Sequence, residues 1–92
     1  MTRRQTVETD TSRLRPRVDT FDVLQSGDMV KLAGEQGDFR FLSAAVDDDG
    51  AVLWVDLHGG MHGREQLRSV MPSRLKIPSE RQLQRQRRAR AA

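Results

Sequence analysis

The arginines at the C-terminal end are the residues of this sequence best suited to chemistry with a partner. Residues 79–92 hold five arginines and one acidic residue. Three of these arginines recur at the i, i+4, i+7 spacing that aligns side chains on one helix face: Arg81, Arg85 and Arg88. Two more lie near that face: Arg87 and Arg90. Because a guanidinium stays charged and can bind phosphate through two parallel hydrogen bonds, the pattern predicts contact with a nucleic-acid backbone.

The distribution of charge leaves two other interpretations of this tail open. The net charge of +3 divides into +2 for residues 1–20, −3 for residues 21–78 and +4 for residues 79–92. The middle of the chain is therefore acidic, and attraction to an anionic partner is concentrated in the two ends. The tail could instead be an unstructured solubilising segment, or it could bind an acidic protein surface.

A second group of candidate binding residues lies in the acidic middle of the chain. Trp54 is the single tryptophan, and if it points outward from its strand it could stack on a base or anchor a protein interface. If it points inward, it would cover the open end of a thin barrel against Phe39 or Phe41. Arg40 lies between these two phenylalanines, and we expect Arg40 and Lys31 to orient a nucleic acid beside Trp54.

Metal and catalytic chemistry find little support in the sequence. There is no cysteine, so a thiolate zinc site and a cysteine nucleophile are excluded. His58 and His62 flank a glycine-rich loop, with Asp56 as the one nearby third ligand, and residues 47–50 lack the rest of a calcium-binding EF-hand loop. We therefore expect no metal, no cofactor and no enzymatic activity.

Short strands separated by glycine-containing turns must position these residues. Alternation of apolar and polar residues predicts strands at 29–32, 39–46, 51–58, 64–70 and 75–77, with a 3₁₀ turn at 71–74 before the last of them. Five short strands predict a mainly β fold, a small antiparallel barrel in residues 21–78. Residues 1–20 read as a disordered basic arm, with order beginning near Phe21.

The C-terminal tail, residues 79–92, carries the signals of a short helix. Ser79 is a suitable N-cap, and Glu80 places a negative charge in the first turn. The helix would run to about Arg90. Because Leu83 is the one side chain that could anchor it, such a helix would be marginal when alone.

Two stretches of the chain resemble parts of a known small barrel. Gly27, Asp28, Val30, Lys31, Leu32, Gly34 and Gly37 look like the opening strand and turn of a KOW motif, and residues 71–75 resemble the 3₁₀ turn and last strand of such barrels. Over residues 27–77 the chain thus resembles the Src-homology-three-like barrel of the KOW and Tudor type. Separately, Trp54–Val55–Asp56 with Gly63–Arg64–Glu65 is similar to small uncharacterised proteins of actinobacterial phages.

Together these observations predict a non-enzymatic interaction module. We expect it to bind nucleic acid, DNA or RNA, or a nucleoprotein without sequence preference through its arginine-rich tails. The alternative is a protein–protein adaptor or a structural phage virion component, of the head or connector, whose tails order on assembly into a homo-oligomer. The longest apolar run, residues 51–55, is far shorter than the roughly 20 residues that span a membrane. We therefore expect no membrane partner and a cytoplasmic location, in a bacterial host if phage-encoded, with the virion as the alternative.

Overall fold

The central hairpin of the fold is formed by its two longest strands. The structure, a computed structural model, describes residues 15–91, and within them β5 (Asp38–Val46) pairs antiparallel with β6 (Val52–Gly60). In the turn between them, the Asp47 carboxylate accepts hydrogen bonds from the backbone N–H groups of Asp49 and Ala51, both at 2.9 Å. The run of aspartates is therefore a hairpin turn, in which the side chain of the first aspartate satisfies local backbone groups.

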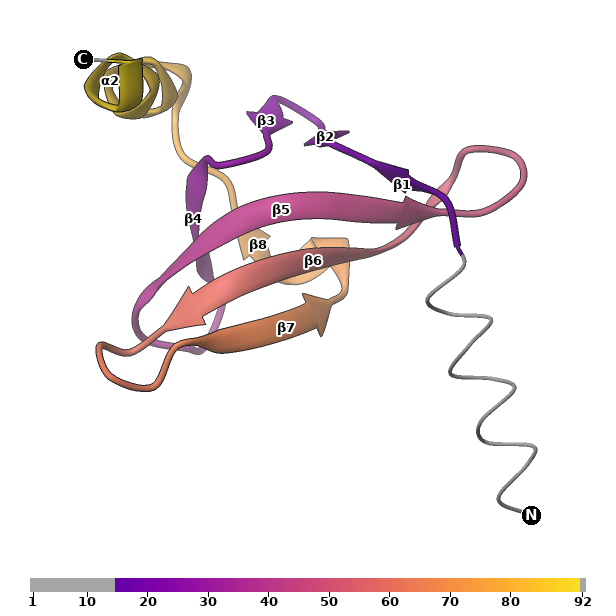
Figure 1. Cartoon of the computed structure of the whole chain (residues 1–92), viewed down its shortest axis with the longest axis horizontal. Coiled ribbons are helices and arrows are strands. Elements are labelled where there is room, and N and C mark those ends of the chain that lie inside the picture. The colour runs from indigo at the N-terminus through magenta and orange to yellow at the C-terminus, as the bar shows by residue number, and fades with distance from the viewer. Residues whose placement is uncertain (1–14, 92) are drawn as a thin grey trace.

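The remaining strands extend this hairpin on both sides. The sheet order is β7-β6-β5-β4-β8, where β7 is Gln66–Val70, β4 is Met29–Leu32 and β8 is Leu75–Lys76. The sheet curls into a half-barrel, and a 3₁₀ helix, η1 (Pro72–Arg74), leads into β8 (Figure 1). The C-terminal helix α2 (Glu80–Ala91) lies beside the start of β4 (Figure 1). The prediction of a mainly β fold with a C-terminal helix is confirmed.

The segment before β4 differs from the sequence-based expectation. β1 (Arg17–Val18) pairs antiparallel with Ala44 and Ala45 of β5, and β2 (Thr20–Phe21) pairs with β3 (Leu24–Gln25). Regular structure thus begins before Phe21. Two-residue strands contain too few residues to show an alternating pattern, so the sequence could not reveal them. The rest of the expected disordered arm, residues 1–14, lies outside the described residues.

The apolar side chains of the strands gather into one core inside the curled sheet. Its buried members are Leu24, Val30, Leu32, Phe39, Phe41, Ala44, Val55, Leu57, Val70 and Leu83. Phe39 and Phe41 both point into this core, which leaves Arg40 between them exposed on the other face of β5. The core also takes in Leu83 of α2, so the helix is part of the folded domain.

A cluster of charged side chains ties the open side of the half-barrel together. Glu35, in the turn after β4, accepts two hydrogen bonds of 2.7 Å from Arg68 of β7 and one of 2.6 Å from Arg74 of η1. The two hydrogen bonds from Arg68, followed by the one from Arg74, lower the pKa of Glu35 from its usual 4.5 to about 2. One carboxylate thereby joins the turn after β4 to β7 and η1, which follow it by 33 and 39 positions in the chain.

Candidate functional site

The helix α2 begins with a reciprocal cap. The Ser79 hydroxyl accepts a hydrogen bond from the Gln82 N–H at 3.2 Å, and the Gln82 side-chain oxygen accepts one from the Ser79 N–H at 3.1 Å. This capping box satisfies two backbone donors at the helix start. Leu83, one turn further on, is only 1% exposed. The predicted N-cap and the predicted anchor of the helix are therefore both present.

The inner face of α2 binds a buried carboxylate. Asp28 is 0% exposed and accepts hydrogen bonds from Arg87 at 2.6 and 3.2 Å, from Arg90 at 2.9 Å and from the Gln25 N–H at 2.8 Å. Burial raises the pKa of this carboxyl, but the hydrogen bonds from Arg87, Gln25 and Arg90 together bring it below the usual value. The same guanidinium groups also donate to the backbone oxygens of Val23 and Gly27. Asp28 thus stays ionised and holds the helix against the sheet.

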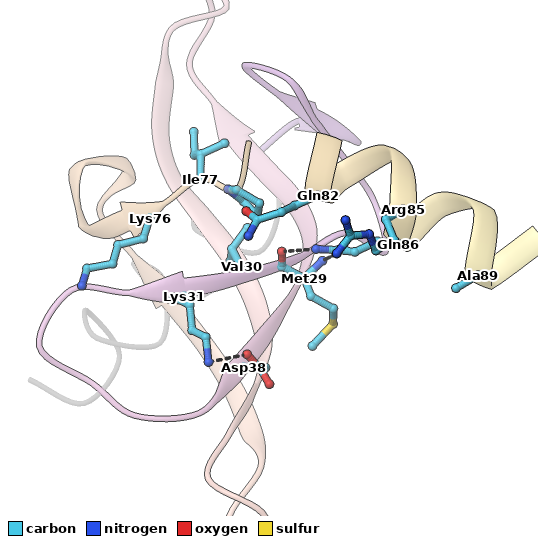
Figure 2. A pocket seen from close by; sticks show the side chains of 11 residues that line it. Met29, Val30, Lys31, Asp38, Lys76, Ile77, Gln82, Arg85, Gln86 and Ala89 are labelled. Atoms are coloured by element: carbon cyan, nitrogen blue, oxygen red, sulfur yellow. Dashed lines mark hydrogen bonds and ion pairs between the residues drawn. The ribbon is translucent and has the colours of Figure 1, made fainter. Parts of the chain in front are cut away.

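A third contact of α2 replaces a missing neighbouring strand. The Gln86 side-chain oxygen accepts a hydrogen bond from the Met29 N–H at 2.7 Å, and its amide nitrogen donates to the Met29 carbonyl at 3.1 Å (Figure 2). A carboxamide carries the same donor and acceptor as a peptide group. Gln86 therefore covers β4 at Met29, beyond the residues that pair with β8, as a strand would.

The five arginines of α2 accordingly divide into two sets. Arg87 and Arg90, both predicted from the sequence to contact nucleic acid, point to Asp28 and are engaged within the domain. At 3.6 residues per turn, Arg81, Arg85 and Arg88 lie about 140–200° around the helix from Leu83. All three are exposed, and none has an ion pair within residues 15–91. We call these three residues the outer arginine face.

Two adjoining grooves extend from this face across the sheet. The first, which we call the helix groove, has a volume of about 610 Å³ and lies between α2 and the β4–β8 edge, where Lys31, Lys76 and Arg85 line it (Figure 2). The second, which we call the sheet groove, measures about 730 Å³ and includes Arg40 and His58. The two grooves share Met29 and Asp38. The structure thus brings three sequence-predicted residues into one continuous region: Lys31, Arg40 and Arg85.

Trp54, by contrast, lies apart from this region and is partly covered. Its indole N–H donates to Asp56 at 3.1 Å, and the guanidinium of Arg17 lies 5.4 Å from the centre of its ring. The Asp56 carboxylate also accepts hydrogen bonds from Arg17 at 2.9 Å and from Ser69 at 2.7 Å. Trp54 therefore points away from the core that holds Phe39 and Phe41, and it joins β1 to β6.

Three residues that hold α2 in place or line the helix groove were not predicted from the sequence. Asp28 follows Gly27 in what reads as an ordinary turn, and nothing local distinguishes a buried aspartate from a solvated one there. Gln86 is one of several glutamines in the tail. Lys76 is an isolated charge in the last strand, so its position beside Lys31 depends on strand pairing that the sequence does not display.

The histidine and acidic side chains of the described residues are not arranged as a metal site. Among residues 15–91 there is no cluster of three or more histidine, aspartate, glutamate or cysteine side chains that could hold a metal ion. His62 lies 3.9 Å from Glu65 and is fully exposed. In the same part of the chain, no helix has the length and apolar character needed to cross a membrane.

The fold and the surface together define a small β domain whose half-barrel carries a docked helix with outward arginines. The chain belongs to the family described as a domain of unknown function, DUF7246, whose model matches residues 15–91. The matched span is the same as the part of the chain that the structure describes. No curated protein and no solved structure matches the chain.

Proposed function

We propose that this protein binds nucleic acid, alone or within a nucleoprotein, without sequence preference. The observation that carries the proposal is the division of arginines on α2. Two arginines satisfy Asp28, while the three of the outer arginine face have no carboxylate partner within residues 15–91. Guanidinium groups held on a docked helix lose less conformational freedom on binding than they would on a flexible tail. The outer arginine face is thus suited to contacting successive phosphates.

Two further cations lie near the outer arginine face, and they too are suited to contacting phosphates. Lys76 and Arg40 are exposed and have no ion pair among the described residues. With the three outer arginines they make five positive charges available to phosphates. Contacts of this kind position a protein on a nucleic acid but carry no sequence information. For this reason we propose binding that is governed by charge and independent of sequence.

The resemblance to a Src-homology-three-like barrel of the KOW and Tudor type is part of the same proposal. Its support is the order of elements, in which four antiparallel strands are followed by η1 and the short strand β8. In this interpretation, α2 is an addition that covers the β4 edge.

The test is nucleic-acid binding by the full chain and by point variants. Removing residues 80–92 would also remove Leu83 from the core, so a truncated protein could fail for structural reasons. Replacing Arg81, Arg85 and Arg88 with glutamine keeps the helix and its docked face. We expect mobility shifts of DNA and RNA at about 50 mM salt to be strongly weakened in this variant. Arg15→Gln serves as the control for loss of a positive charge away from α2, because Arg15 adjoins Pro16, whose carbonyl accepts a hydrogen bond from the Val46 N–H at the end of β5.

Two results would contradict the proposal. One is the absence of any shift with the unchanged protein at low salt. The other is a shift that the triple variant retains in full. If an acidic polypeptide such as polyglutamate binds the outer arginine face and nucleic acid does not, the result would favour an acidic protein as the partner.

A second candidate function is supported by a different surface. Within residues 15–91, β7 pairs with β6 and has no strand on its other side. Leu67 and Met71 there are 72% and 60% exposed. An open edge with exposed apolar side chains is suited to pairing with another chain. This edge supports a protein–protein adaptor or a virion component, and light scattering of the protein and of a Leu67→Lys variant would test it, because the variant should lower the measured mass of any oligomer.

A further inference from the structure

Two lysines lie directly opposite each other at the mouth of the helix groove. Lys31 of β4 and Lys76 of β8 are partners in the antiparallel register. Like charges in directly opposed positions destabilise a sheet. Asp38 offsets one of them through an ion pair of 2.7 Å with Lys31, whereas Lys76 has none among the described residues. The pair therefore weakens the fold slightly, and it leaves Lys76 as the lysine of the two that has no acidic partner among the described residues.

A third cation reaches the same groove from the helix. Arg85 belongs to the outer arginine face and also lines the helix groove from α2, whereas Lys31 and Lys76 line it from the sheet (Figure 2). Three cations thus line a groove in which Asp38 is the one acidic residue. Since all three are exposed, the folded core does not require their charge.

The remaining wall of the helix groove is largely apolar. Met29 and Ile77 come from the sheet side, Pro78 from the link to the helix, and Ala89 from the helix itself. A duplex that lies on the outer arginine face would present phosphates and would not reach this wall. An unpaired nucleotide has a phosphate, which can pair with the cations. It also has a flat, weakly polar base, which can pack against the apolar wall. The volume of about 610 Å³ leaves room for such a unit.

We propose that the helix groove holds an unpaired nucleotide of a single-stranded nucleic acid. Its phosphate and that of the next nucleotide contact the cations that line the groove, Lys76 on the sheet side and Arg85 on the helix side, and its sugar or base lies against Met29 and Ile77. This inference rests on the proposed function and adds to it a preference for single strands over duplexes.

Fluorescence anisotropy with a labelled oligonucleotide, alone or annealed to its complement, tests the preference. We expect the single strand to bind about tenfold more tightly than the duplex, because its base can bury apolar surface against the groove wall. Ala89→Leu fills the groove without a change of charge and should remove most of that difference. Gln84→Leu adds the same side chain on the other flank of α2, outside the groove, and should leave it intact.

The outcomes separate this inference from the proposed function. Equal affinity for both nucleic acids, or no effect of Ala89→Leu, would overturn the helix groove as a nucleotide site while nucleic-acid binding itself stands. No binding of either would overturn the proposed function. In amide NMR spectra, the single strand should shift the Met29 and Ile77 signals. If a free mononucleotide produces the same shifts with the same affinity as the single strand, the helix groove is a site for small ligands, and this result would also overturn the inference.

Discussion

Arg87 donates two hydrogen bonds to the buried carboxylate of Asp28, although the two residues are 59 positions apart in the chain. This contact turns a segment that reads as a basic tail into part of a folded domain. It also removes Arg87 from the set of cations that can meet a partner. The position of the outer arginine face is a consequence, because fixing one side of a helix orients the other.

Replacing Asp28 with asparagine should loosen α2. Arg87 and Arg90 would then face a neutral amide, and we expect a loss of about 2 kcal/mol in the free energy of unfolding. For a domain of this size each kcal/mol corresponds to a fall in melting temperature of roughly 4–8 °C. Thermal denaturation followed by circular dichroism measures this. Asp48→Asn, in the exposed β5–β6 turn, is the matched control, and an unchanged melting temperature in the Asp28 variant would contradict the role given to this contact.

The stability of the domain should fall in acid because of Glu35. Its pKa is about 2 in the folded protein against a usual value of 4.5, so between these pH values the unfolded chain binds more protons than the folded one. The stabilisation is therefore complete above about pH 4.5 and is lost as the pH falls toward 2. The lowered pKa of Asp28 acts in the same direction.

Urea denaturation at a series of pH values tests this dependence. A Glu35→Gln variant should be less stable than the unchanged protein at neutral pH, and the difference between the two should shrink as the pH falls toward 2. If the free energies of unfolding of the two proteins differ by the same amount across the whole pH range, the ion pairs of Glu35 with Arg68 and Arg74 are not the cause of the loss of stability in acid.

Gln86→Ala should expose the edge of β4. Both backbone groups of Met29 would lose their partner, and we expect a cost of about 1–3 kcal/mol together with faster hydrogen exchange of the Met29 amide. Hydrogen exchange followed by NMR provides the measurement. Gln84→Ala removes a glutamine from an exposed position of the same helix and should leave the Met29 amide protected. Equal protection in both variants would show that the side chain does not replace a strand.

Salt dependence should report the number of phosphates that the protein contacts. Engagement of five cations predicts a log–log slope of binding against salt of roughly −4.5 with duplex DNA. Substitution of the three outer arginines should reduce its magnitude to roughly 1.8. Anisotropy titrations at several salt concentrations give both values. Binding that is indifferent to salt would show that phosphate contacts do not dominate.

Local patterns in the sequence were sufficient for most of the fold. The strand periods, the Asp47 hairpin turn, the 3₁₀ turn and the Ser79 cap each depend on residues a few positions apart, so each can be recognised without knowing the rest of the structure. The outward position of Arg40 follows from the same alternation. The i, i+4, i+7 spacing likewise identified the three arginines of the outer face.

Which arginines remain available was decided by the tertiary structure alone. Arg87 and Arg88 are neighbours of the same type, and they differ because Asp28 packs against one side of α2. In the same way, Lys31 and Lys76 become opposed only when β4 and β8 pair in their observed register. Such relationships join residues 45 or more positions apart. The chain sequence therefore determined the elements and their charges, whereas long-range packing decided which charges face inward and which face a partner.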